Sequence, residues 1–137
     1  MGVINLEQTL VIIKPDGVER NLIGSILNEY ERNGLVIKNI KMLVADEELA
    51  KEHYDEHVDK PFFNNLVDYI TSGPSCVLII EGENAIERVR KINGATNPKE
   101  AQDNTIRALY GLELSKNTVH ASDSQKSAKR EISIWFA

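Results

Sequence analysis

Cysteine and long hydrophobic runs are scarce in this sequence, and each scarcity excludes a class of protein. Cys76 is the single cysteine among 137 residues, so no disulfide can form within the chain. No window approaches the roughly 18 apolar residues that cross a bilayer. Residues 1–8 have neither a basic start nor an apolar run of signal-peptide length. We therefore expect a soluble, cytoplasmic protein with no membrane partner.

An excess of positive charge is also missing. The chain has 16 Lys and Arg against 21 Asp and Glu, a net charge of -5, and its pI is near 5.2. Proteins that bind nucleic acid usually carry a basic surface, so we do not expect nucleic acid as a partner. The phosphate-binding patterns G-x-x-x-x-G-K-[ST] and, after a strand, G-x-G-x-x-G are absent. The length corresponds to about one domain, so we expect a single domain over residues 1–137.

The hydrophobic pattern alternates between short strands and amphipathic helices. Short β-branched or apolar runs predict strands at residues 9–13, 35–45, 76–80 and 119–120. Apolar residues at helical spacing predict helices at residues 22–33, 85–93, about ten residues from 47, a segment from 61 to 72, and the last residues of the chain.

Turn and capping residues mark the borders of these elements. Pro15 and Gly17 predict a turn after the first strand. Asp46 is the expected cap of the helix that begins at residue 47, and Ser122 stands three residues before Gln125 in a capping-box pattern. The order of elements predicts an α+β fold, a ferredoxin-like split βαβ sandwich with a four-stranded, mostly antiparallel sheet covered by helices.

Helical periodicity fades between residues 94 and 116, and hydrogen-bond donors gather in and beside this segment. A loop of that length in a compact domain is more often functional than not. Guanidinium groups bind phosphate oxygens bidentately, so these donors can converge on a polyanion such as a triphosphate. The alternative is that they are ordinary exposed polar groups of an acidic protein. The donors are Lys14, Arg90, Thr96, Arg107 and Asn117.

His120 is the candidate nucleophile, at the junction of a short strand and the last helix. A neutral imidazole is a good nucleophile at pH 7 when a carboxylate fixes its tautomer. Glu131 lies in the third turn of the helix that follows and can reach the ring. Asp123 either caps that helix or holds a water on phosphate-bound Mg²⁺. The alternatives are a structural histidine and a Glu131 that pairs with Lys129 or Arg130 on the surface.

Taken together, the segments around these residues resemble the nucleoside diphosphate kinase family. The resemblance covers essentially the whole chain, in order, and it depends on a set of motifs that are weak individually and specific together. The motifs are Lys14-Pro15-Asp16-Gly17, Lys60-Pro61-Phe62-Phe63, Ser72-Gly73-Pro74, Gly94-Ala95-Thr96-Asn97-Pro98, Thr105-Ile106-Arg107 and Asn117-x-x-His120-x-Ser122-Asp123-Ser124.

The resemblance implies a phosphotransferase that maintains the pools of NTP and dNTP. The γ-phosphate of a nucleoside triphosphate passes to a nucleoside diphosphate by a ping-pong mechanism, through a phosphohistidine on His120. His120 is implied to attack through Nδ1 while Glu131 holds the other ring nitrogen. The implied cofactor is Mg²⁺, which Asp123 reaches through water.

The resemblance also assigns the nucleotide contacts. Stacking on a base and holding its sugar do not read base edges, so the site is expected to accept purines and pyrimidines alike. The residues implied to contact phosphate are Lys14, Tyr54, Arg90, Thr96 and Arg107, those implied to sandwich the base are Phe62 and Leu114, and those implied to contact the ribose are Lys14 and Asn117.

Some positions depart from the family pattern. Many members have Gly at Ala121, Gly-Arg at Ser115-Lys116 and a polar residue at Leu109. An alanine restricts φ beside the nucleophile, and a lysine cannot reproduce an arginine fork. The resemblance further implies a closed homo-oligomer. Because the chain lacks the tail of many relatives, tetramer and hexamer both stay open, and we expect the apolar end at residues 134–136 to be exposed for assembly.

Two other functions compete with this interpretation. The segment from His53 to His57 fits H-x-x-E-H, the pattern of inverted zinc proteases, although a solvated helix face is the simpler explanation. The second alternative is a ferredoxin-like module that binds a nucleotide or regulatory ligand without catalysis. Such a module would keep the cationic cluster and Phe62 but would not need His120 beside Glu131.

Overall fold

The computed structural model describes residues 6–114 and 116–137. Its sheet has four strands in the order β2-β3-β1-β4. Strand β3 pairs antiparallel with β1 and β2, and β1 pairs antiparallel with β4. Because β3 separates β1 from β2, the sheet has the split βαβ arrangement, and the predicted α+β class is confirmed. The strands are β1 (Leu6–Ile13), β2 (Val36–Leu43), β3 (Ser75–Glu83) and β4 (Val119–Ala121).

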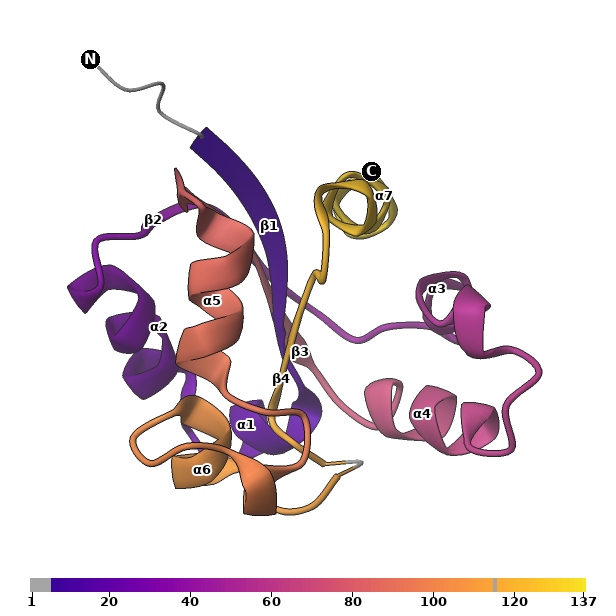
Figure 1. Ribbon diagram of the computed structural model, residues 1–137. Coiled ribbons are helices and arrows are strands. Elements are labelled where there is room, and N and C mark those ends of the chain that lie inside the picture. The colour runs from indigo at the N-terminus through magenta and orange to yellow at the C-terminus, as the bar shows by residue number, and fades with distance from the viewer. Residues whose placement is uncertain (1–5, 115) are drawn as a thin grey trace.

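Helices cover both faces of this sheet (Figure 1). Helices α2 and α5 lie on one side, and α3, α4 and α7 lie on the other. The bounds are α1 (Pro15–Glu19), α2 (Ile23–Arg32), α3 (Glu47–His53), α4 (Phe63–Ile70), α5 (Ala85–Asn93), α6 (Ile106–Tyr110) and α7 (Gln125–Trp135), with 3-10 turns η1 (Asp55–His57) and η2 (Pro98–Glu100). No helix in the described ranges is both long and apolar enough to cross a membrane.

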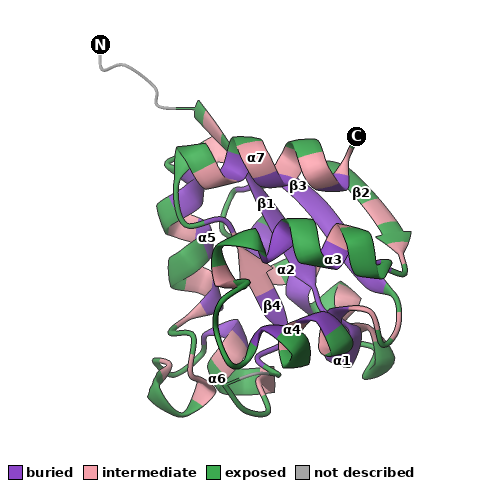
Figure 2. Ribbon diagram, turned by 90° about the vertical axis from the view of Figure 1, so that its right-hand side faces the viewer, coloured by how far each residue is buried: buried purple, intermediate pink, exposed green. Residues whose placement is uncertain are grey.

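The central strand β1 supplies side chains to both hydrophobic clusters. Successive strand residues point to opposite faces of a sheet. Val11 and Ile13 accordingly pack in the cluster under α2 and α5, whereas Leu10 and Ile12 pack in the cluster under α3, α4 and α7. Figure 2 shows the buried strands enclosed by helices whose outer sides are exposed. Lys14 directly follows β1 at the end of this buried centre, and His120 lies on the neighbouring edge strand β4.

Two segments differ from the sequence-based expectation. The predicted turn at Pro15 and Gly17 is wrong, because these residues form helix α1, with Pro15 at its first position. Proline fits there since its fixed φ suits the helix and its missing N–H needs no partner. The aperiodic segment 94–116 contains η2 and α6. Both are too short to display a helical period, since α6 has 5 residues.

Candidate active site

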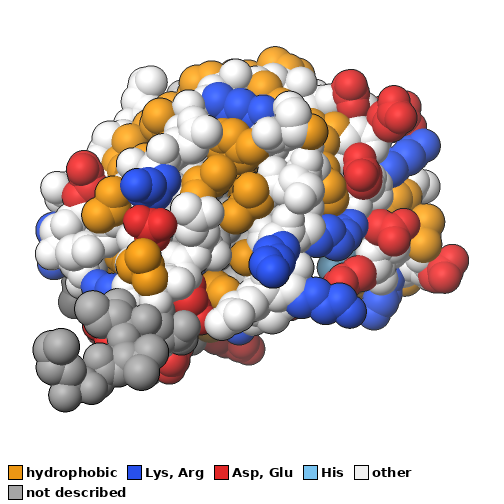
Figure 3. Space-filling view, turned by 90° about the horizontal axis from the view of Figure 1, so that it is seen from above, with side chains coloured by type: hydrophobic (Ala, Val, Ile, Leu, Met, Phe, Trp, Pro, Cys, Tyr) orange, Lys and Arg blue, Asp and Glu red, His pale blue; other side chains and the backbone are white. Residues whose placement is uncertain are grey.

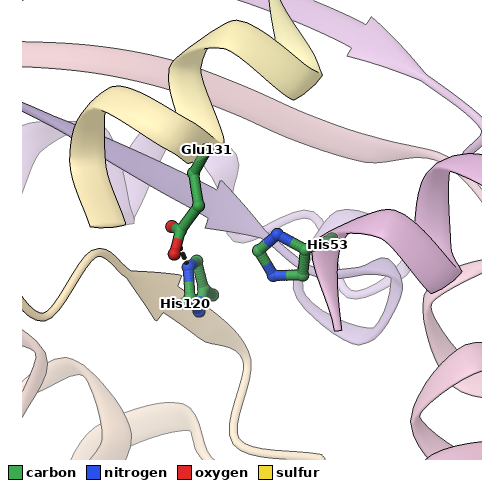
Figure 4. A group of neighbouring side chains, drawn as sticks. All are labelled: His53, His120 and Glu131. Atoms are coloured by element: carbon green, nitrogen blue, oxygen red, sulfur yellow. Dashed lines mark hydrogen bonds and ion pairs between the residues drawn. The ribbon is translucent and has the colours of Figure 1, made fainter. Parts of the chain in front are cut away.

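His120 lies in the middle of β4, and α7 holds its ring. The residue pairs with Ile12 of β1, and 24% of its side chain is exposed. Glu131 Oε1 lies 2.6 Å from His120 Nε2 (Figure 4). Because a carboxylate only accepts hydrogen bonds, this contact favours the ring proton on Nε2 and leaves the lone pair of Nδ1 available. The two residues that the sequence suggested as a pair are thus in contact.

Ser122 supports Glu131 in a way that the sequence analysis missed. Its Oγ donates a hydrogen bond to Glu131 Oε1 at 2.9 Å and accepts one from the Leu10 amide at 3.3 Å. The predicted capping box at Ser122 is wrong, because Ser124 directly precedes α7 and accepts the Ser127 amide. Residues two apart in extended chain share a face, so the spacing of His120 and Ser122 was the signal for this contact.

His53 is a buried neighbour of the candidate nucleophile. The His53 ring packs edge-on against the His120 ring, with 4.6 Å between centroids. Trp135 Nε1 donates to His53 Nδ1 at 3.0 Å. Burial, and secondarily the nearby His120, Lys14, Arg130 and His57, hold the pKa of His53 well below its ordinary value. The ring is therefore neutral, with its proton on Nε2.

The burial of His53 contradicts both sequence-based interpretations of the segment from His53 to His57, the zinc-protease pattern and the solvated helix face. Helix α3 ends at His53, and His57 belongs to the separate turn η1, so the two histidines do not share one helix face. Ligand atoms of His53, His120 and Glu131 do lie within 4.8 Å of one another. The hydrogen bond from Trp135 and the contact between His120 and Glu131 already occupy a nitrogen of each ring. The segment is neither a solvated helix face at His53 nor an inverted zinc-protease motif.

Tyr54 follows His53 at the end of α3, and it is buried. Burial and, second, the Glu131 carboxylate raise the pKa of Tyr54 to about 12. The hydroxyl therefore keeps its proton at neutral pH and can donate it to an anion. Tyr54 lines a small cavity of about 120 Å³ together with His53, His120 and Glu131.

A second cavity, of about 270 Å³, also borders His120. Cationic and amide groups converge on it from the residue after β1, from α5, from α6 and from the segment before β4. This convergence excludes the alternative of scattered exposed cations. Guanidinium and ammonium groups around one hollow form a binding site for phosphate. The sequence-predicted residues that line it are Lys14, Arg90, Thr96, Arg107, Asn117, His120 and Asp123.

Lys14, at the end of β1, is nearly buried in this cavity wall. Its Nζ donates to Asn117 Oδ1 at 2.9 Å, and Asn117 Nδ2 donates to the Thr96 carbonyl. Burial and then Arg107 lower the pKa of Lys14 to about 8, against the opposing effect of Asp16. Between pH 8 and the ordinary lysine pKa, the unfolded chain binds more protons than the folded chain. The contribution of Lys14 therefore raises the free energy of unfolding as the pH rises through this range.

Arg107, in α6, ties two segments of the cavity together. Its Nη1 donates to the Gly94 carbonyl at 2.7 Å and its Nη2 to the Val119 carbonyl at 2.8 Å. Gly94 has φ of +88°, and a Cβ there would lie 2.4 Å from Thr105 Oγ1, so only glycine fits beside α6. Burial lowers the pKa of Arg107, but guanidinium stays protonated in proteins.

Asp123 and Arg90 form the outer part of the cavity, where both are exposed. Hydrogen bonds from Ser127 and Ser124 and the charge of Arg90 lower the pKa of Asp123, with the Ser127 bond the largest cause. Asp123 is therefore ionised at neutral pH. Mg²⁺ in nucleotide sites is held by one or two carboxylates together with substrate phosphates and water, and a single ionised carboxylate at the mouth of a phosphate cavity fits that requirement.

The residues implied to sandwich a base lie outside this cavity. Phe62 precedes α4 and is 43% exposed, and Leu114 is 59% exposed. The Phe62 ring lies 5.7 Å from the ring of His57, which does line the cavity. Of the departures from the family pattern, Ala121 lines the cavity and Leu109 is exposed on α6. Ser115 lies outside the described residues.

Comparisons with known proteins identify the family of this chain. The family model described as "Nucleoside diphosphate kinase" matches residues 7–137. A protein of that name from Clostridium perfringens is 54% identical over 97% of this chain and 93% of its own length. One from Pyrococcus horikoshii is 55% identical over 95% of this chain and 85% of its own.

Solved structures give the same result. The nucleoside diphosphate kinase of Aquifex aeolicus has a TM-score of 0.94 and 44% identity, and covers 96% of both chains. That of Halobacterium salinarum, solved in complex with CDP, has a TM-score of 0.93 and 47% identity, and covers 95% of this chain and 87% of its own.

Proposed function

Because the chain belongs to the nucleoside diphosphate kinase family, whose members transfer phosphate between nucleotides, we propose that it carries the γ-phosphate as a phosphohistidine on His120. The observation that supports this proposal most directly is the bond between His120 Nε2 and Glu131, which leaves the Nδ1 lone pair available on a ring that lines a cationic cavity. The reaction moves phosphate from a nucleoside triphosphate to a nucleoside diphosphate, and so maintains the pools of NTP and dNTP.

The proposed chemistry has two symmetric halves. The lone pair of His120 Nδ1 attacks the γ-phosphorus, the bond to the bridging oxygen breaks, and its electron pair leaves with the diphosphate. Glu131 stabilises the positive charge that develops on the ring through the Nε2 proton. A second diphosphate then attacks the phosphorus, and the electrons of the N–P bond return to Nδ1. Since both nucleotides use one site, the kinetics are ping-pong.

Fixed positive charge lowers the barrier for both halves. The transferring group spreads negative charge over its equatorial oxygens, and donors that already point there need no rearrangement. We assign this role to Lys14, Arg90 and Arg107, with hydrogen bonds from Tyr54 and Thr96. Phe62 and Leu114 would hold the base, and Lys14 and Asn117 the ribose, which predicts broad base specificity.

Asp123 would hold Mg²⁺ through water at the mouth of the cavity. When bound, the ion supplies positive charge to the phosphate oxygens. The side chain itself is kept ionised by Ser127, Ser124 and Arg90. These contacts explain how Asp123 can serve a cation while it lies next to an arginine.

Incubation with γ-labelled ATP and Mg²⁺ tests the covalent intermediate. The protein should take up label that is lost in acid and survives base, as phosphohistidine does, and initial-rate plots at several diphosphate concentrations should be parallel. Acid-stable label would place the phosphate on another residue. Intersecting plots would mean that both nucleotides bind at once, which contradicts one shared site for the two nucleotides.

We also propose that the chain forms a homo-oligomer, tetramer or hexamer, through the free edge of β2. The expectation of an exposed apolar end is wrong for Trp135, which is only 1% exposed because α7 packs on β1, whereas Ile134 and Phe136 are partly buried. Instead Val36, Ile40 and Met42 of β2 are about half exposed, and the view from above shows a broad hydrophobic area beside mixed charges (Figure 3). An unpaired edge strand can pair with the same strand of a second copy about a twofold axis.

Light scattering at micromolar concentration should therefore show an oligomer, and Ile40→Glu should shift it toward smaller species because a charge cannot be buried unpaired in the contact. Leu109→Glu, at an equally exposed leucine on α6, is the matched control and should leave the mass unchanged. A monomeric wild-type protein, or equal effects of both variants, would exclude this interface.

A further inference from the structure

Thr118, two residues before His120, has an unusual backbone conformation. Its φ is +78°, in the left-handed region. The other non-glycine residues with positive φ in the described ranges are Asn21, Asn84 and Asn104, and asparagine tolerates this region. A β-branched residue there is a true outlier, and it persists only where its surroundings hold it. Something around Thr118 must compensate for this strain.

Helix α1 provides that compensation through two neighbouring residues. Asp16 Oδ2 accepts a hydrogen bond from Thr118 Oγ1 at 2.7 Å. A Cβ on Gly17 would lie 3.0 Å from Thr118 Cγ2, so the absence of a side chain at Gly17 makes room for the threonine methyl group. The Thr118 carbonyl accepts the Lys14 amide at 2.8 Å. The side chain of Thr118 is thus recognised at both its hydroxyl and its methyl group, and it is fully buried.

The conformation of Thr118 sets the direction of the groups on either side. On one side, Asn117 binds Lys14 Nζ. On the other, the Val119 carbonyl accepts Arg107, and His120 follows. An ordinary negative φ at Thr118 would turn Asn117 away from the cavity relative to His120. The strained residue therefore places the amide, the cations and the nucleophile around one hollow.

The Asp16 carboxylate is also the negative charge that raises the pKa of Lys14. Burial raises the pKa of Asp16, while Thr118, Lys14 and Arg20 oppose that rise. Its Oδ1 is buried without a hydrogen bond, and Arg20 Nη1 lies 3.6 Å from Oδ2. The charged groups that act on Lys14 are Arg107 from α6, which lowers its pKa, and Asp16, which raises it. Of these, Asp16 alone favours the protonated amine.

We propose that Asp16 and Thr118 are positioning residues of the phosphate site: the carboxylate anchors the strained threonine that orients Asn117 and His120. The negative charge of Asp16 also acts on the Lys14 amine, as a second contribution. This inference depends on the proposed function of His120 and Lys14. Neither residue touches the nucleotide in this scheme. The two contributions differ in what they need, because the first depends on the hydrogen bond between Thr118 and Asp16 and the second on the charge of the carboxylate.

Two variants test the contributions one at a time. Thr118→Val removes the hydroxyl and keeps shape and the Asp16 charge, so kcat/KM should fall about tenfold across the whole pH range, as small misplacements of reacting groups do. Asp16→Asn keeps an oxygen acceptor and removes the charge, so the rate near pH 6.5 should change little. The fall of kcat/KM at alkaline pH, which we expect to follow the Lys14 pKa of about 8, should move to lower pH in Asp16→Asn. Thr118→Ser should retain most activity.

Glu19 is an exposed acid on the same helix, and Glu19→Gln is the matched control. It should change neither kcat/KM nor its pH profile. Wild-type rates at every pH in both test variants would overturn the inference. If Thr118→Val does not fold, the pH profile of Asp16→Asn is the test. A shift of its alkaline fall in kcat/KM to lower pH supports the inference, and an unshifted profile contradicts it. A wild-type protein that takes no label from ATP would instead refute the proposed function, and with it the premise of this inference.

Discussion

Replacing His120 with glutamine should abolish phosphate transfer and leave nucleotide binding nearly intact. Glutamine has similar length and still bonds to Glu131, but its amide nitrogen is not a nucleophile. Lys14, Arg107 and Asn117 do not use His120 to hold their positions, because their bonds run to one another and to backbone carbonyls. Calorimetry with a nucleoside diphosphate should give a Kd of the same order of magnitude as for the wild-type protein. Incubation with γ-labelled ATP should leave no acid-labile label on the variant.

The control for this variant is His57→Gln. His57 also lines the cavity and is the other partly exposed histidine, but its Nδ1 has no hydrogen-bond partner that would fix a tautomer. This variant should still be labelled. Label that persists in His120→Gln and disappears in His57→Gln would move the nucleophile to η1 and contradict the mechanism. Loss of nucleotide binding in His120→Gln would show that the ring also builds the cavity.

Sequence patterns were informative where one local rule decides the outcome. The contact of His120 with Glu131 could be predicted because a helix that returns past its preceding strand brings its inner turns beside that strand, and in the structure Glu131 lies in the second turn of α7. Asp46 could be predicted as a cap, and its carboxylate accepts the Leu49 amide. Long amphipathic elements such as α2 and α5 were also placed within a few residues.

Features that depend on contacts between distant elements could not be predicted in the same way. Trp135 looked like exposed apolar surface at the chain end, yet it is buried beside His53 because α3 packs on α7. The hydrogen bond between Asp16 and Thr118 joins residues 102 positions apart. A positive φ at a threonine has no signature in composition or periodicity, since its compensation comes entirely from tertiary contacts.

Arg107→Ala should lower kcat/KM on the order of 10²-fold or more, the loss that follows removal of one preorganised donor. Lys14→Ala should lose a similar amount. The effect of Arg107 has a second source, because its guanidinium joins the Gly94 and Val119 carbonyls and thereby fixes the loop before Thr96 against β4. Arg107→Lys tests this geometry, since an ammonium keeps the charge but cannot span two carbonyls in the guanidinium plane.

Arg107→Lys should therefore recover only part of the lost rate. Arg32→Ala, which removes a mostly exposed arginine of α2 that pairs with Glu29, should leave kcat/KM unchanged. Thermal melts of each variant separate a loss of folded protein from a loss of transition-state stabilisation. If Arg107→Ala stays folded and transfers phosphate at the wild-type rate, the cavity beside His120 is not where the γ-phosphate sits. Full recovery in Arg107→Lys would instead mean that charge alone matters and that the bonds to Gly94 and Val119 serve only the fold.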